Sequence, residues 1–144
     1  MRTLLVLVLL ASSASAQTTY TSIVPDGSTG LWSSESSWSP AGVPGPADTA
    51  IITGEIQMNA NHTVSELRLR NGALLGDGTL TVSDSAAWTG GRLDARGFSD
   101  SAALRILFGA VLAIRDGNPK SLRGRDIDVK GRIDWDGRDS LEVR

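Results

Sequence analysis

Aspartates gather near the end of the chain, where they could bind a metal ion. Asp134, Asp136 and Asp139 surround the glycine of the segment DWDGRD. Hard carboxylate oxygens around a glycine turn are the ligands that calcium favours, although this spacing differs from the helix-loop-helix calcium signature. The sequence therefore predicts a calcium site at these three aspartates and no other cofactor.

An exposed strand explains the same aspartates without a metal ion. Charged and apolar residues alternate from residue 126 to residue 136, and successive side chains of a strand point to opposite faces. One face would hold Asp126, Asp128, Lys130, Arg132, Asp134 and Asp136, and the other Ile127, Val129, Ile133 and Trp135. Opposite charges interleaved on a solvated face contribute little stability. Both hypotheses stay open at this point.

Polysaccharide cleavage is a further hypothesis for the charged residues. Glycoside hydrolysis needs two suitably spaced carboxylates, and a lyase needs a base, often beside a cation. The candidates are Arg123, Arg125, Asp126, Asp128, Lys130 and Arg132. Their spacing does not distinguish them from surface charges, and no serine lies in a nucleophile motif. The sequence favours a protein without catalysis and keeps a lyase or glycoside hydrolase as the alternative.

Histidine, cysteine and tryptophan add little chemistry. His62 is the only histidine and lies in a polar segment, so we expect a surface residue rather than part of a zinc site. The chain has no cysteine, which excludes cysteine-ligated zinc and a cysteine nucleophile. Trp88 and Trp135 could stack on sugar rings if exposed, but we expect core or corner residues.

Short apolar–polar–apolar triplets must position these residues. From about residue 64 onward the triplets recur between turns rich in glycine and aspartate. They begin at Leu67, Leu80, Leu104, Leu112, Ile127, Ile133 and Leu141. Strands this short need stacked neighbours, and no window has helical periodicity. The sequence predicts an all-β parallel β-solenoid, with an antiparallel β-sandwich or jelly roll as the alternative. Leu67, Leu80 and Leu93 recur every 13 residues, which suggests an imperfect repeat.

The chain divides into three parts. Residues 1–16 have a positive charge, a short apolar run and a small-residue cleavage site, so we expect a signal peptide and secretion. Residues 17–46 are polar, then rich in tryptophan and proline. The prolines exclude a helix, so we expect Trp32 and Trp38 to cover an apolar end. Residues 47–144 would form the coils.

Charge and hydropathy limit the partners. The formal net charge is −2, from 14 basic and 16 acidic residues, and removal of the signal with its one arginine would leave −3. No basic field is present to attract nucleic acid. The leader's apolar run is far shorter than the roughly 20 residues that span a bilayer. We expect neither nucleic-acid binding nor a membrane-spanning segment.

The stretch from Leu31 to about Leu93 resembles a known family. Its first part, WSSESSWSPAGVPGPADTAIITG, is similar to the entry segment of secreted bacterial parallel β-helix proteins. The continuation, NGALLGDGTLTVSDSAAWTGGRL, resembles the glycine-rich coils of autotransporter-like β-strand-repeat surface proteins. The resemblance implies a right-handed parallel β-helix, export and a surface or extracellular role. Such families include both adhesins and polysaccharide-cleaving enzymes, so the fold does not choose between them.

Together these patterns predict an adhesin-like or structural scaffold that is secreted or displayed on the cell surface. Its polar turns would bind a polysaccharide or an extracellular host surface. A polysaccharide-active enzyme and a calcium-stabilised carbohydrate-binding module are the alternatives. The sequence stops inside the predicted strand Leu141–Arg144, so we expect either a truncated relative of longer proteins or an edge protected by its charges.

Overall fold

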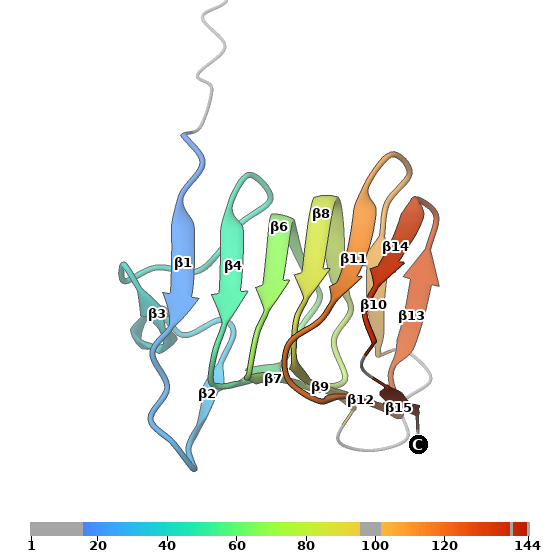
Figure 1. Cartoon of the computed structure of the whole chain (residues 1–144). Helices are drawn as coiled ribbons and strands as arrows, with labels where there is room; N and C mark the ends of the chain where they lie inside the picture. The colour runs from blue at the N-terminus through green and yellow to red at the C-terminus, as the bar shows by residue number, and fades with distance from the viewer. Residues whose placement is uncertain (1–15, 96–101, 139, 144) are drawn as a thin grey trace, which may run out of the picture.

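The protein is a parallel β-solenoid of about four turns in the computed structural model, which describes residues 16–95, 102–138 and 140–143. Its strands form two sheets (Figure 1). The nine-stranded sheet holds β1 (Thr19–Ser22), β3 (Trp38–Ser39), β4 (Thr49–Ile52), β6 (His62–Leu69), β8 (Leu80–Trp88), β10 (Ala103–Ile106), β11 (Val111–Arg115), β13 (Asp126–Val129) and β14 (Arg132–Asp136). The six-stranded sheet holds β2 (Thr29–Leu31), β5 (Glu55–Met58), β7 (Ala73–Gly76), β9 (Gly91–Asp94), β12 (Lys120–Arg123) and β15 (Leu141–Val143).

Each full turn has three sides because the nine-stranded sheet bends. The first residues of β8 pair with β10 on the rear side, and its last residues pair with β11 on the front side. In Figure 1 the front strands descend and β10 and β13 rise behind them while successive turns move to the right, so the coil is right-handed. Successive turns stack in parallel, and only the short β3 pairs antiparallel, with β1. This confirms the predicted solenoid and makes the antiparallel sandwich or jelly roll wrong.

Inward side chains of successive turns form apolar columns. Three columns are Leu67–Ala86–Leu112–Ile133, Leu69–Trp88–Ile114–Trp135 and Leu74–Leu93–Leu122–Val143. Neighbours in the first column are 19, 26 and 21 residues apart, because the corners differ in length. The 13-residue spacing is therefore not the repeat of the coil: Leu67, Leu80 and Leu93 lie on three different sides.

Glycines let the turns approach closely at the corner between the front side and the six-stranded sheet. Gly54, Gly72 and Gly91 occupy this corner in three successive turns. A Cβ atom at Gly72 would lie 2.3 Å from the carbonyl oxygen of Gly54, and one at Gly91 would lie 2.1 Å from that of Gly72. Gly91 also has a φ of +88°, which L-residues rarely adopt. The corner therefore requires glycine for its backbone and for its spacing.

Tryptophans fill the N-terminal end of the solenoid. Trp32 and Trp38 are fully buried, with ring centroids 5.0 Å apart in an edge-on arrangement. Trp38 Nε1 donates a hydrogen bond of 2.9 Å to the carbonyl oxygen of Trp32. A 3-10 turn, η1 (Glu35–Ser37), precedes β3, which pairs antiparallel with β1. These residues close the interior at this end.

The coil begins earlier than the expected boundary at residue 47. β1 pairs in parallel with β4, and β2 pairs in parallel with β5. Residues 1–15, and with them nearly all of the predicted signal peptide, lie outside the described residues, so that hypothesis stays a prediction. Within the described ranges, no helix is long and apolar enough to cross a membrane.

Candidate functional site

A groove of about 470 Å³ runs along the glycine corner. It begins at the loop between β1 and β2 and crosses the first residues of β5, β7, β9 and β12 before it reaches β15. Its charged lining residues are Asp26, Glu55, Arg92, Lys120 and Glu142. The five strands that line it lie side by side, so four spacings of about 4.8 Å give a groove roughly 19 Å long. The site therefore suits an elongated ligand.

The corner glycines also make the groove hollow. Gly27, Gly54, Gly72 and Gly91 are among its lining residues and contribute no side chain. The same absence of a Cβ atom that lets the turns approach also exposes backbone polar groups to a ligand. The shape of the groove thus follows from the local sequence of each corner.

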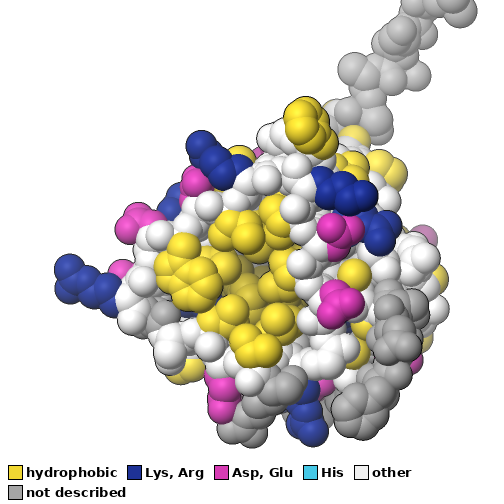
Figure 2. Space-filling view, turned by 90° about the vertical axis from the view of Figure 1, so that its right-hand side faces the viewer, with side chains coloured by type: hydrophobic (Ala, Val, Ile, Leu, Met, Phe, Trp, Pro, Cys, Tyr) yellow, Lys and Arg dark blue, Asp and Glu magenta, His cyan; other side chains and the backbone are white. Residues whose placement is uncertain are grey.

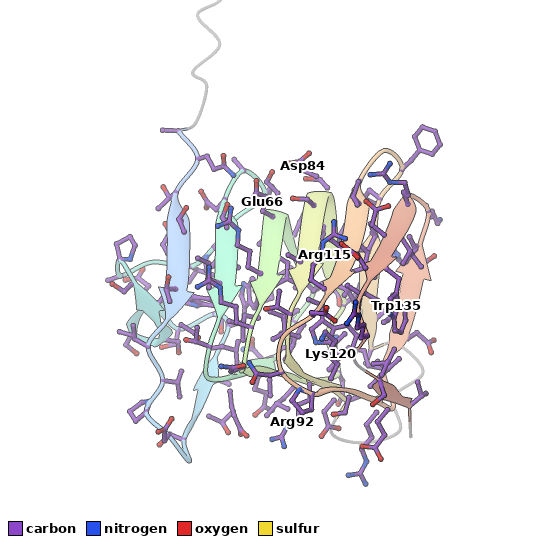
Figure 3. All side chains as sticks on the ribbon, in the orientation of Figure 1. Glu66, Asp84, Arg92, Arg115, Lys120 and Trp135 are labelled. Carbon is purple, nitrogen blue, oxygen red and sulfur yellow. The ribbon has the colours of Figure 1, made fainter. Side chains whose placement is uncertain are left out.

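An ion pair joins two turns across the groove. Arg92 on β9 donates a hydrogen bond of 2.5 Å from Nη2 to Glu55 Oε1 on β5, passing over β7. The Arg92 side chain is 43% exposed and that of Glu55 34%, so solvent screens the pair. Arg92 Nε is buried without a hydrogen-bond partner. Arg92 lies at the lower edge of the solenoid in Figure 3. Lys120, by contrast, is only 3% exposed, and its Nζ atom donates a 3.3 Å hydrogen bond to the carbonyl oxygen of Asn118. Cations and carboxylates arranged along one line can hydrogen-bond to the hydroxyl and charged groups of a polymer.

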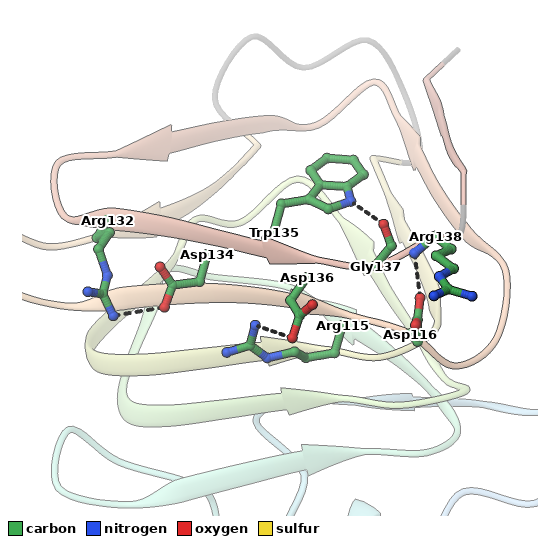
Figure 4. Close-up of polar contacts among 8 residues, drawn as sticks. All are labelled: Arg115, Asp116, Arg132, Asp134, Trp135, Asp136, Gly137 and Arg138. Atoms are coloured by element: carbon green, nitrogen blue, oxygen red, sulfur yellow. Dashed lines mark hydrogen bonds and ion pairs between the residues drawn. The ribbon is translucent and has the colours of Figure 1, made fainter.

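The C-terminal aspartates lie on the outward face that alternation predicted. Arg132 Nη2 donates a 2.8 Å hydrogen bond to Asp134 Oδ2, and Arg115 Nη1 lies 3.7 Å from Asp136 Oδ2 (Figure 4). On the rear side Arg105 Nε donates to Asp128 Oδ2 at 3.1 Å. The predicted alternation of outward charges and inward apolar residues holds within each strand, but the charges lie on two strands, β13 and β14, and not on one strand face. These pairs are exposed and each contributes at most about 1 kcal/mol.

The calcium hypothesis stays a prediction. Asp134 and Asp136 each have an arginine as a neighbour, and Asp139 lies outside the described residues. In the ranges that the structure describes, no three histidine, cysteine, aspartate or glutamate side chains are grouped to hold a metal ion. The geometry therefore gives no additional ligand to the predicted three.

Arg125, one of the candidates for polysaccharide cleavage, is a buried structural residue. Its side chain crosses the interior of the corner between turns and is only 3% exposed. Nη1 donates to the carbonyl oxygens of Gly78 at 2.8 Å and Ala103 at 3.2 Å, and Nη2 donates to that of Gly76 at 2.5 Å. Burial lowers the pKa of Arg125 to about 10, although Asp77 opposes the shift. Arg125 cannot reach a substrate on the surface.

The other candidates are divided between separate places. Asp126 and Asp128 line a second hollow of about 530 Å³ on the rear side, together with Arg105. Arg132 pairs with Asp134 on the front side, and Arg123 lies at the exposed end of β12. Lys130 is exposed at the corner between β13 and β14. The structure therefore brings Asp126 and Asp128 together but does not assemble the whole set.

His62 is not the surface turn residue that the sequence predicted. It begins β6, and its ring stacks on Trp32 with centroids 5.4 Å apart. Its Nε2 atom is buried without a hydrogen-bond partner, and burial lowers the pKa of His62. The turn ends one residue earlier, so His62 lies in a strand with one face of its imidazole against the tryptophan cap, and the residue remains partly exposed.

The two other tryptophans have different environments. Trp88 is 2% exposed and belongs to the core, as expected. Trp135 occupies the equivalent column position in the last turn but is 51% exposed. Its Nε1 atom donates a 3.2 Å hydrogen bond to the carbonyl oxygen of Gly137. The difference follows from its position at the end of the coil rather than from the sequence around it.

Sequence reasoning missed the residues that line the groove. Glu55, Arg92 and Glu142 are far apart in the chain and belong to no motif. One local signal was present, because Glu55 and Arg92 each directly follow a corner glycine, Gly54 and Gly91. Aligning the glycine-to-strand transitions would have placed both residues at the same corner.

Fold and groove together define the class of this protein: a parallel β-solenoid with a polar groove along its axis. Comparisons of the chain with family models, with curated proteins and with solved structures find no match. What the structure shows of the resemblance is therefore the β-solenoid architecture alone.

Proposed function

We propose that this protein is a secreted, non-catalytic scaffold that holds an extended polysaccharide along its corner groove. The observation that carries the proposal is the groove itself, which crosses five strands of the six-stranded sheet and presents charges of both signs. A stacked coil is stiff along its axis, so the groove keeps its spacing without a bound ligand. Such preorganisation favours the binding of a regular polymer.

The positions and partners of the charged residues in the groove support binding rather than cleavage. Cleavage by hydrolysis requires two carboxylates that flank one glycosidic bond. Glu55 is engaged by Arg92, and Asp26 and Glu142 come from opposite ends of the solenoid. The ion pair instead positions a donor and an acceptor on one line, which is an arrangement for recognising polar groups.

Binding to polysaccharides tests the proposal directly. The protein would be titrated with neutral and acidic polymers, pectin and alginate among them, in affinity electrophoresis and calorimetry. Each polymer would then be assayed for new reducing or unsaturated ends. We expect binding to at least one polymer without any product.

Two arginine substitutions locate the binding site. Arg92→Gln removes the charge from the groove and should weaken binding by roughly tenfold, the effect of losing a charged hydrogen bond. Arg115→Gln removes a similarly exposed arginine from the front side and should leave binding unchanged. Equal effects of the two variants on binding would contradict the claim that the polymer binds in the groove. Formation of a cleavage product would instead establish the enzyme alternative.

A further inference from the structure

The end of the solenoid opposite the tryptophan cap is open and apolar. Figure 2 looks onto this end and shows a continuous hydrophobic patch surrounded by charged side chains. Ile133 and Trp135 are each 51% exposed and Val143 is 67% exposed. Leu122, Ile127, Val129 and Leu141 are partly buried beside the core. We call this surface the open end.

The exposed residues of the open end are inward residues of the coil. Ile133, Trp135 and Val143 continue columns whose other members are almost all buried. They are exposed because no strand covers the last turn in the described part of the chain. Water contact at a core position costs free energy that burial would recover, at about 25 cal/mol per Å² of apolar area.

Backbone groups at the open end are also unpaired on one side. β13 and β15 lie at the ends of their sheets, and β14 pairs only with β11 in the described ranges. Such edges add a further strand readily. At the other end of the solenoid, β3 covers β1 and two buried tryptophans fill the interior. A head-to-tail contact therefore lacks a second open interior, whereas another open end provides one.

We infer that two copies of this chain associate through their open ends, with β14 of one copy antiparallel to β14 of the other about a two-fold axis. This contact is self-complementary and closes after two copies. It joins the two apolar interiors and pairs the two β14 edges. The inference is independent of the proposed polysaccharide groove.

The charges on β14 select the register of this contact. A two-fold axis at Ile133 places Arg132 of each copy opposite Asp134 of the other, and the two Ile133 residues face each other. An axis at Asp134 would oppose two aspartates, and one at Arg132 would oppose two arginines. An axis at Trp135 would place Asp134 opposite Asp136 twice. Among two-fold axes within β14, only the one at Ile133 gives unlike charge pairs and no like pair.

Disulfide cross-linking measures the contact and its register, because the natural chain has no cysteine. Directly opposed residues of antiparallel strands have Cα atoms about 4.5–5.5 Å apart, which a disulfide spans. We expect Ile133→Cys to give a covalent dimer under mild oxidation. Asp136→Cys is the control, since it is more exposed but lies roughly 20 Å from its symmetry mate in this register. Light scattering should show a dimer of the unmodified chain.

Charge exchange gives a second test that does not depend on cysteine. Arg132→Asp and Asp134→Arg each create like pairs in a homodimer and should weaken the dimer by roughly tenfold. A mixture of the two variants contains only unlike pairs and should dimerise again, which also shows that both variants are folded. A monomer at the highest attainable concentration overturns the inference. Cross-linking of Asp136→Cys as readily as Ile133→Cys, or no recovery in the mixture, overturns the register.

Discussion

Two glycines allow a matched test of how closely the turns pack. Gly91 and Gly109 have nearly the same positive φ, +88° and +87°. Their surroundings differ, because a Cβ atom at Gly91 would lie 2.1 Å from the carbonyl oxygen of Gly72, whereas nothing lies within 4 Å of one at Gly109. Gly91→Ala and Gly109→Ala therefore separate the contact between turns from backbone strain.

The magnitudes follow from these two environments. Gly109→Ala should lower the free energy of unfolding by about 1–2 kcal/mol, the cost of a left-handed backbone at an L-residue. Gly91→Ala also places an L-residue at a positive φ, and β9 must in addition move away from the turn beside it. That movement stretches the 3.0 Å hydrogen bond from Arg92 N to the carbonyl oxygen of Gly72. Overpacking adds about 1–3 kcal/mol, so we expect a total of about 2–5 kcal/mol.

Urea unfolding followed by circular dichroism and by tryptophan fluorescence measures both changes. The slope of the transition should be the same in both variants, so that the midpoints report stability. Equal losses of stability in Gly91→Ala and Gly109→Ala would refute the reasoning. That result would mean that the corner can widen without loss of stability. The close approach of successive turns would then not be the reason why glycine is required at this corner.

Two further predictions concern buried basic groups. Arg125→Met leaves buried carbonyl oxygens without this donor, so in urea unfolding it should lower the free energy of unfolding by about 2–4 kcal/mol. Arg123→Met is the control at an exposed position and should change the free energy of unfolding by less than about 0.5 kcal/mol. Because burial lowers the pKa of His62 from its ordinary value of 6.5, the unfolded chain binds more protons just below that pH. Acidification through this window should therefore reduce stability, and His62→Phe, which keeps a ring against Trp32, should make the decrease smaller in urea unfolding at a series of pH values.

The sequence allowed correct predictions wherever a property depends on near neighbours in the chain. Alternation from residue 126 to residue 136 assigned Asp134 to the outward face and Ile133 to the inward column, as the structure shows. The short triplets indicated stacked strands, since a strand of three or four residues cannot be stable alone. Both inferences use only the two-residue period of a strand, which the backbone imposes in any β fold.

Predictions failed where a residue's role depends on its neighbour in the next turn. Arg125 was indistinguishable from a surface arginine, yet it hydrogen-bonds to carbonyl oxygens almost fifty residues earlier in the chain. His62 was assigned to a surface turn because its sequence neighbours are polar, but it begins a strand and Trp32 stacks on one face of its ring. Because the corners differ in length, the residues that pair between successive turns are not a constant number of positions apart in the sequence. No fixed sequence spacing therefore predicts which residues pair.

The sequence alone thus determined that the described part of the chain is all-β, which side of each strand is apolar and where glycine permits a tight corner. These properties follow from steric limits on φ and from the alternation of side chains within a strand. Only the tertiary structure decided that Glu55 meets Arg92, that a groove crosses the six-stranded sheet and that Trp135 is exposed while Trp88 is buried. These properties depend on which turn lies above and below a residue, and stacking forms such contacts only when the whole coil has closed.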